Sequence, residues 1–215
     1  MIKIGLMSKL ILVRHGETEK NTQGLLHDSF DQEVLNSKGR QQIRVTAKHL
    51  TSFNLDLIFS SKESRAVESS LILSKELVIP FQEIEGLHER NWGKLSGKPW
   101  SDIKRILDPM GLDERYAYLP PGGESWQRFE RRLNQAVKHL VSNSSDKSIV
   151  VVTHGGAIRA LMPFLLSVPK EESFKYDPDN ASVTIFNVIS PNQYENVVVN
   201  STSHLPDKLK TVRVN

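Results

Sequence analysis

Short apolar runs alternate with helical apolar spacing along most of the chain. The runs at 10–13, 55–59 and 149–152 each end in polar residues, a pattern typical of strands buried on both faces of a parallel sheet. Apolar side chains recur at helical spacing over 43–50, 66–77 and 129–140, which predicts amphipathic helices. We therefore expect a three-layer α/β/α fold, with helices on both faces of a mostly parallel central sheet.

Two later segments extend this pattern. Residues 182–189 and 194–199 are separated by Ser190-Pro191-Asn192-Gln193, which predicts a hairpin that extends or edges the sheet. Residues 85–123, here called the insertion, are rich in glycine, proline and charge. We expect the insertion to be mobile, to lie over the strand ends and to hold one short helix at about Trp100–Leu107. Ligands of open α/β sheets bind at the carboxyl ends of the strands, so the site is expected there.

The chain has the length of one ordinary domain. Its 215 residues contain no internal repeat, flexible linker or biased segment. We expect an N-terminal extension at 1–8, one domain at 9–203 and a C-terminal tail at 204–215, solvated from Lys208 onward. Translation from Met1 and from Met7 are both compatible with the first predicted strand. Monomer and homodimer are both compatible with the sequence.

Composition and charge restrict the chemistry more than the fold. The absence of cysteine excludes disulfides, thiolate metal sites and cysteine nucleophiles. A formal net charge of +3 without a dense basic run gives no indication of a nucleic-acid surface. The apolar stretch at 149–168 is interrupted by His154, Gly155, Gly156 and Arg159, so we expect no membrane span. No export signal precedes the charged residues at 14–17, and we expect a cytoplasmic protein.

Two histidines directly follow buried strands. Arg14-His15-Gly16 comes after the first strand, and Thr153-His154-Gly155-Gly156 comes after the run at 149–152. Glycine lets the backbone approach a ligand closely, and a helix that opens at Gly155-Gly156 attracts anions through its free N–H groups. The alternative interpretation is structural: either histidine would then be a packing residue beside a turn.

An arginine lies close to a third strand end. Ser60-Ser61-Lys62-Glu63 matches a capping box, with Ser60 as N-cap and Glu63 at the third helical position, which places Arg65 in the first helical turns. A cation gains nothing from the helix dipole at that end, so an external anion explains Arg65 better than helix stability does. The alternative is a surface salt bridge with Glu63 or Glu68.

Two arginines and two histidines from three strand ends would form a site for a dianionic phosphate. Guanidinium groups bind phosphate oxygens bidentately, and a neutral imidazole can attack phosphorus. Neighbouring cations would keep that imidazole uncharged, and a backbone carbonyl on its other nitrogen would fix the tautomer. A carboxyl group must then protonate the leaving alkoxide and later activate water. We predict phosphoryl transfer through a phosphohistidine.

Four motifs in order resemble the histidine phosphatase superfamily, the phosphoglycerate mutase-like enzymes. They are Leu10–Asn21, Ser60–Ala66, Leu87–Gly93 and Thr153–Gly155, and the match covers about 9–199. The resemblance implies the phosphoglycerate mutase-like fold and assigns these roles: His15 is the phosphorylated nucleophile, Arg14, Arg65, His154 and Gly155 bind the phosphoryl group, Asn21 supports the phosphate pocket, and Glu89 is the proton donor. Glu17 stays an alternative proton donor because it too lies beside the nucleophile. Pro163 is expected to kink or end the helix that follows His154.

The branch of the family is the remaining choice. Glu89–Gly97 resembles the mutase segment, in which the arginine and the aromatic residue, here Arg90 and Trp92, contact substrate. The mutases also carry a longer insertion with paired arginines, whereas no adjacent arginines occur between Gly93 and Gly123. The segment that ends at Pro120–Ser125 resembles fructose-2,6-bisphosphatase-like phosphatases. We therefore favour hydrolysis of a small phosphorylated metabolite, with a cofactor-dependent phosphoglycerate mutase and then a non-catalytic phosphate-binding scaffold as alternatives.

Aromatic and further histidine residues complete the candidates. A pocket for a sugar or nucleotide group could be shaped by aromatic residues of the insertion and its flank, namely Trp92, Trp100, Tyr116, Tyr118 and Trp126. His27-Asp28 resembles part of a metal-dependent phosphohydrolase site, but no second metal motif accompanies it, and arginines would repel a cation. We expect no metal and no cofactor. Four histidines without partners at catalytic spacing are expected at the surface or in packing: His49, His88, His139 and His204.

Overall fold

A six-stranded sheet forms the middle of the molecule in the computed structural model, which describes residues 8–27 and 32–212. The strand order is β3-β2-β4-β1-β5-β6. The strands are β1 (Lys9–Arg14), β2 (Leu57–Ser60), β3 (Phe81–Glu83), β4 (Ile149–Thr153), β5 (Val183–Ser190) and β6 (Gln193–Ser201). The first four run parallel, and β5 pairs antiparallel with β1 and β6. The mostly parallel sheet and the late hairpin at its edge are confirmed, whereas β3 was not predicted.

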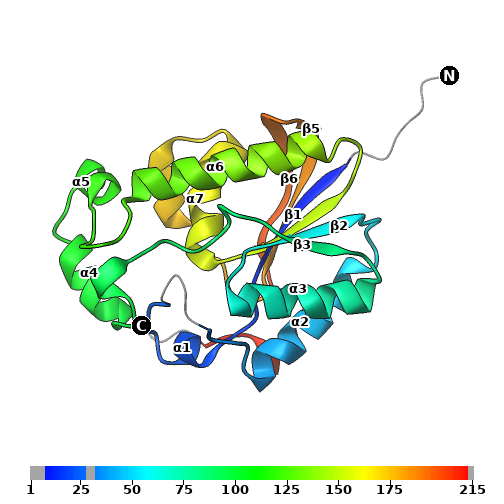
Figure 1. The fold of residues 1–215 in the computed structure, drawn as a ribbon, viewed down its shortest axis with the longest axis horizontal. Helices are drawn as coiled ribbons and strands as arrows, with labels where there is room; N and C mark the ends of the chain where they lie inside the picture. The colour runs from blue at the N-terminus through cyan, green and yellow to red at the C-terminus, as the bar shows by residue number, and fades with distance from the viewer. Residues whose placement is uncertain (1–7, 28–31, 213–215) are drawn as a thin grey trace.

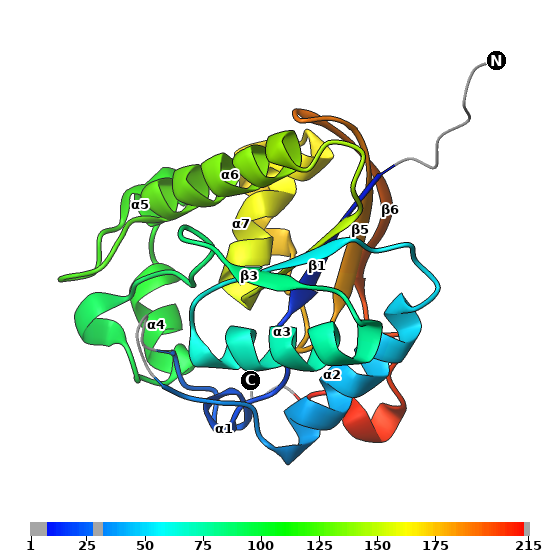
Figure 2. The ribbon, with the colours of Figure 1, turned by 45° about the vertical axis from the view of Figure 1, so that its right-hand side comes forward.

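Helices cover both faces of this sheet (Figures 1 and 2). The helices α2 (Ser37–Leu50) and α3 (Ser64–Leu77) pack on one face, and α6 (Trp126–Asn143) and α7 (Gly155–Leu166) pack on the other. Each face has its own core: Ile11 and Val150 belong to one cluster, while Leu10 and Val151 belong to the other. Successive strand side chains point to opposite faces, so one apolar run supplies both cores. The three-layer prediction is confirmed.

The start of α3 differs from the predicted capping box. Ser60 is the last residue of β2 and is paired in register with Val152 and Glu83. Its backbone therefore continues the sheet instead of starting a helix. The N-cap residue is Glu63, whose side chain makes no capping hydrogen bond. The predicted capping box is wrong, although Arg65 does lie in the first turn of α3.

Pro163 does not end the helix that follows His154. It lies inside α7, which continues to Leu166 and ends at Ser167 in the left-handed conformation, with φ of 55°. Proline removes one helical N–H donor, but the amide of Val168 donates to the carbonyl of Pro163 at 3.1 Å and closes the last turn. The loss of one bond near the helix end is therefore compatible with helix continuation.

The insertion contains more structure than the sequence predicts. The predicted helix is present as α4 (Trp100–Leu107), and the segment also holds η1 (Gly93–Leu95) and α5 (Leu112–Ala117). The helices α4 and α5 lie together at one end of the molecule (Figure 1). Shorter elements elsewhere are α1 (Glu19–Thr22), η2 (Lys170–Lys175) and η3 (Asp207–Leu209). Among the described helices, none is both long enough and apolar enough to cross a membrane.

The C-terminal segment packs against α2. Leu209 is buried, and Nε2 of Gln42 donates to the carbonyl of Leu209 at 2.7 Å and to Oγ1 of Thr211 at 3.1 Å. Buried amide donors need acceptors, and these two residues supply them. The prediction of a solvated tail from Lys208 onward is therefore wrong for Leu209 and Thr211, while Asn215 lies outside the described residues.

Candidate active site

Three neighbouring strands deliver the predicted residues to one edge of the sheet. In the strand order, β4 lies between β2 and β1. The register pairs Arg14 with Thr153 and Ser60 with Val152. The segments that follow β1, β2 and β4 therefore leave the sheet at nearly the same level. The amide of His15 then donates to the carbonyl of Thr153 at 3.0 Å. His15, Arg65 and His154 are far apart in sequence, and this register brings the segments that carry them together.

The imidazole of His15 is buried and fixed in one tautomer. Its Nδ1 lies 2.8 Å from the carbonyl oxygen of Gly16. A carbonyl only accepts, so Nδ1 carries the proton and Nε2 keeps its lone pair. The ring centroid lies 5.2 Å from that of His154. Burial, followed by the charges of Arg65, His154, Arg14 and His27, holds the pKa of His15 well below its usual value.

Beside His15, a buried glutamate joins two of the predicted phosphate-binding residues, Arg65 and His154. Arg65 and His154 are fully buried, and Nη2 of Arg65 lies 3.3 Å from Oε2 of Glu63. The same oxygen contacts Nε2 of His154, which also lies 2.9 Å from Oγ of Ser61. The alternative ion pair between Arg65 and Glu63 exists, but in the interior instead of at the surface, and Glu68 pairs with Arg40. We call His15, Glu63, Arg65 and His154 the floor cluster.

The charge of Glu63 is stabilised despite its burial. Burial raises the pKa of this carboxyl group, but His154, Arg65 and the backbone N–H of Glu89 together outweigh that effect and lower it well below its usual range. A carboxylate with these partners stays ionised at neutral pH. The sequence pattern indicated Glu63 as a capping residue and as an alternative surface partner of Arg65, so its place in the buried site was missed.

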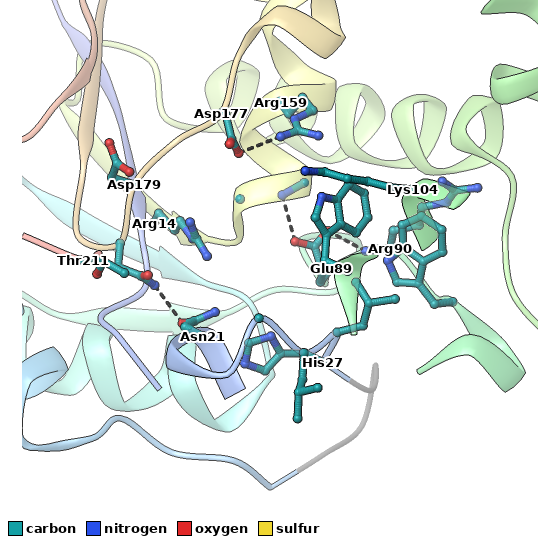
Figure 3. Close-up of a pocket in the computed structure, with 18 of the residues that line it drawn as sticks. Arg14, Asn21, His27, Glu89, Arg90, Lys104, Arg159, Asp177, Asp179 and Thr211 are labelled. Carbon is teal, nitrogen blue, oxygen red and sulfur yellow. Dashed lines mark hydrogen bonds and ion pairs between the residues drawn. The ribbon is translucent and has the colours of Figure 1, made fainter. Parts of the chain in front are cut away.

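Arg14 and Asn21 lie above the floor cluster, at the wall of a cavity. Nη1 of Arg14 donates to the carbonyl of Pro178 at 2.6 Å, and a Cβ at Gly155 would lie 3.2 Å from the guanidinium carbon. Glycine at 155 therefore lets the guanidinium rest on the start of α7. Oδ1 of Asn21 accepts from Nδ2 of Asn180 at 2.9 Å (Figure 3). Asn180 was not predicted, because only the pairing of β1 with β5 brings it here.

Glu89 faces the cavity at the N-terminus of α7. Its Oε2 accepts from the amide of Gly156 at 2.8 Å, and its Oε1 accepts from the amide of Arg90 at 2.7 Å (Figure 3). A Cβ at Gly156 would overlap Oε1, so glycine is required for this approach. The alternative carboxyl group, Glu17, is buried away from the cavity lining, where Nδ2 of Asn36 donates to it at 3.1 Å.

The cavity has a volume of about 490 Å³. Its lining includes six of the predicted residues, namely Arg14, Asn21, Glu89, Arg90, Trp92 and Gly155. His15, Arg65 and His154 do not belong to the lining and lie beneath it. Three tryptophans, Trp92, Trp100 and Trp126, contribute apolar wall. Tyr116 and Tyr118 are not among the lining residues. Tyr116 packs edge-on against Phe174, and its hydroxyl donates to the carbonyl of Lys170.

Two arginines hold the insertion in place. Arg90 donates to the carbonyls of Glu124 and Tyr118 at 3.1 and 3.0 Å, and burial lowers its pKa to about 10. Arg132 donates through Nη1 to the carbonyls of Gly86 and His88 at 2.9 and 3.0 Å. No pattern in the sequence around Arg132 indicates a role for it. The structure shows that it anchors the segment that carries Glu89.

His27 also lines the cavity, although its sequence motif did not predict a place in the site. Its Nε2 lies 3.0 Å from Oγ1 of Thr18 and 3.2 Å from Oε2 of Glu33. Its neighbour Asp28 lies outside the described residues. Within residues 8–27 and 32–212, no group of three or more side chains has the arrangement of a metal site. The four remaining histidines do not line the cavity.

Comparisons with known proteins match most of the chain to one superfamily. Residues 10–202 match the model of the histidine phosphatase superfamily, branch 1. A 2,3-bisphosphoglycerate-dependent phosphoglycerate mutase of Cytophaga hutchinsonii is 30% identical, over 77% of this chain and 81% of its own. A metal-independent phosphoserine phosphatase of Arabidopsis thaliana is 28% identical, over 72% and 67%. The solved structure of Bacillus stearothermophilus YhfR superposes with a TM-score of 0.80 at 28% identity, over 92% and 98%.

Proposed function

The chain belongs to the histidine phosphatase superfamily, and from this premise we propose that it is a metal-independent phosphomonoesterase that forms a phosphohistidine at His15. The observation that carries the proposal is the bond from Nδ1 of His15 to the carbonyl of Gly16. It leaves Nε2 with a lone pair, in a setting that lowers the pKa of this imidazole. A neutral histidine beside buried cations is the form that attacks phosphorus.

In the first step, the lone pair of Nε2 attacks the phosphorus of a phosphate monoester. The N–P bond forms while the P–O bond to the leaving alkoxide breaks. The carboxyl group of Glu89 gives its proton to that alkoxide, a contribution of about 10²–10⁴ in rate. Arg14, Arg65 and the N–H groups at the start of α7 stabilise the charge that develops on the phosphoryl oxygens.

In the second step, water replaces the imidazole. The carboxylate of Glu89 takes one proton from a water molecule, and the hydroxide oxygen bonds to phosphorus as the N–P bond breaks. Inorganic phosphate leaves, and the electron pair returns to Nε2 of His15. One carboxyl group thus serves both steps, and the amides of Gly156 and Arg90 hold this group at the cavity.

Hydrolysis is favoured over phosphate transfer between two positions of phosphoglycerate. A carboxylated substrate needs cations in the wall of the cavity. Arg131 and Arg132 do not line the cavity, and the guanidinium groups of Arg90 and Arg159 are bound to protein oxygens. Apart from Arg14, which we assign to the phosphoryl group, the described part of the lining offers a carboxylate one lysine, Lys104, and no pair of adjacent arginines. The mutase alternative predicts interconversion of 2- and 3-phosphoglycerate that 2,3-bisphosphoglycerate stimulates. We expect no interconversion of these esters beyond their hydrolysis, because the paired arginines of the mutases have no counterpart in this wall.

The substrate is proposed to be a small phosphate ester with a sugar or nucleotide group. The three tryptophans of the cavity wall offer the apolar faces on which such rings pack. A panel of sugar bisphosphates, nucleotides, phosphoserine and phosphoglycerates tests this class. A preference for phosphoserine over every ring-containing ester would contradict it.

The test of the mechanism compares the wild-type protein with His15→Ala. The wild type is expected to hydrolyse an aryl phosphate in the presence of EDTA, and the variant is expected to lose this activity. Acid-labile phosphate should appear on His15 when the wild-type reaction is quenched. Turnover that EDTA abolishes would contradict metal independence, and no turnover of any phosphomonoester would favour the scaffold alternative.

A further inference from the structure

Glu63 is a buried carboxylate to which the mechanism above assigns no step. Its exposed fraction is 5%, and its four contacts come from three segments of the chain. Oε2 contacts Nε2 of His154 and lies 3.3 Å from Nη2 of Arg65. The same oxygen accepts from the amide of Glu89 at 3.0 Å and from Oγ of Ser61 at 3.4 Å. One carboxylate therefore links the phosphate-binding side chains to the proton donor.

The two ring nitrogens of His154 have different surroundings. Nε2 is engaged by Glu63 and Ser61, and an ionised carboxylate can only accept, so Nε2 carries a proton. Nδ1 is buried, and the described residues give it no hydrogen-bond partner. The ring lies next to His15, with centroids 5.2 Å apart, so a phosphoryl group on His15 would be within reach of this nitrogen.

Resting on the proposed phosphohistidine mechanism, we propose that Glu63 is a positioning residue that holds His154 as an imidazolium, with its Nδ1–H ready to bind a phosphoryl oxygen. An adjacent carboxylate favours the charged form of an imidazole. The bond at Nε2 also fixes the ring plane, so Nδ1 is the nitrogen left for the ligand. A charge-assisted hydrogen bond from Nδ1 would strengthen as charge builds on the phosphoryl oxygens.

The charges around the pair are consistent with this role. A carboxylate below a phosphate site would repel the dianion if it stood alone. Here Arg65 contributes a second positive charge on the side of α3. Other groups face the pair from neighbouring elements: His15 from the end of β1, with Arg14 and His27 beside it, and His88 and the amide of Glu89 from the insertion. Burial, followed by the charges of Arg65, His154 and Arg14, lowers the pKa of His15, which keeps the nucleophile neutral.

The test is the pH dependence of kcat/KM in Glu63→Gln, measured from pH 5 to pH 9 with an aryl phosphate. Glutamine keeps an acceptor for the amide of Glu89 but removes the charge. At pH 8 we expect a loss of about tenfold or more, the value of one hydrogen bond to a charged group. The loss should be larger at pH 8 than at pH 5, because protons from solution can replace the effect of the carboxylate only where they are abundant.

The matched control is Glu68→Gln, in α3, the helix that follows Glu63. Glu68 also pairs with an arginine, Arg40 at 2.6 Å, and accepts from a backbone amide, that of Leu35 at 2.8 Å, but it does not line the cavity. Its kcat/KM should match the wild type at every pH. A loss in Glu63→Gln that is equal at all pH values, or no loss in a folded variant, would overturn the proposal.

A second measurement needs no variant. Nitrogen-15 spectra of the wild-type imidazoles should show His154 protonated on both nitrogens at pH 7.5, and a neutral His154 would also overturn the proposal. Absence of acid-labile phosphate on His15 in the quenched wild-type reaction is a separate result. It would refute the proposed mechanism itself, whereas the protonation of His154 would still be read from the spectra.

Discussion

The floor cluster and the insertion hold their side chains by different means. Residues of the floor cluster follow three adjacent parallel strands, so the register of the sheet sets their separation. Glu89 in the insertion depends instead on single side chains, above all Arg132, that bind backbone carbonyls. The difference indicates that the chemistry of phosphorus is built into the sheet, whereas proton donation and substrate contacts depend on a segment attached to it. Three experiments can break or sharpen this comparison.

The largest effect is expected where the two regions meet, in Gly156→Ala. The new Cβ would overlap Oε1 of Glu89 and displace the proton donor while leaving His15 unchanged. We expect kcat/KM for alkyl phosphates to fall about 100-fold, a value typical of a misplaced catalytic group. Aryl phosphates should lose less, because their leaving groups need less protonation.

A suitable control for this substitution is Gly111→Ala at the start of α5. There a Cβ would lie 3.5 Å from Oε2 of Glu114, an ordinary contact. Equal losses for alkyl and aryl esters in Gly156→Ala would show that the substitution damages the floor cluster as well, and the separation of the two regions would fail.

A smaller effect is expected for Arg132→Gln within the insertion. The carbonyls of Gly86 and His88 would lose their donor, and the segment that ends at Glu89 would loosen. We expect kcat to fall about tenfold, because removal of one side chain weakens the position of the proton donor without removing it. Arg131→Gln is the control, since Arg131 is exposed and does not contact this segment. Phosphate inhibition should stay at the wild-type level, and a large change in it would contradict the independence of the floor cluster.

The smallest effect concerns stability and pH. The folded-state pKa of His15 is lowered, so between neutral pH and the acid range the unfolded chain binds a proton that the folded chain does not. The contribution of neutral His15 to the free energy of unfolding is complete above pH 6.5, the usual pKa of histidine, and decreases as the pH falls below that value. In His15→Asn, the decrease in Tm from pH 7 to pH 5 should be smaller by about 2–4 °C. Arg132→Gln should keep the wild-type slope, and an equal slope in both variants would refute the assignment to His15.

The sequence predicted the floor cluster better than the insertion. Buried parallel strands have a clear apolar pattern, and polar residues at their ends must meet, which was sufficient to group His15, Arg65 and His154. Glu63 was misread because its charge suited a helix start, and only the sheet register shows that the strand runs on through Ser60. The role of Arg132 depends on contacts with residues 86–89, far from it in sequence, and no local pattern records them.

The hydrogen bonds of Gln42 have a practical consequence for handling the protein. Its Oε1 accepts from the amide of Glu17 at 2.8 Å, directly after the His15 motif, while its Nε2 binds Leu209 and Thr211. Thr211 lines the cavity, whereas Lys9 starts β1 at the opposite end of that strand from His15. A purification tag fused behind Asn215 would therefore begin four residues from the rim where the ester enters, and kinetic work is better done with the fusion partner at the amino end.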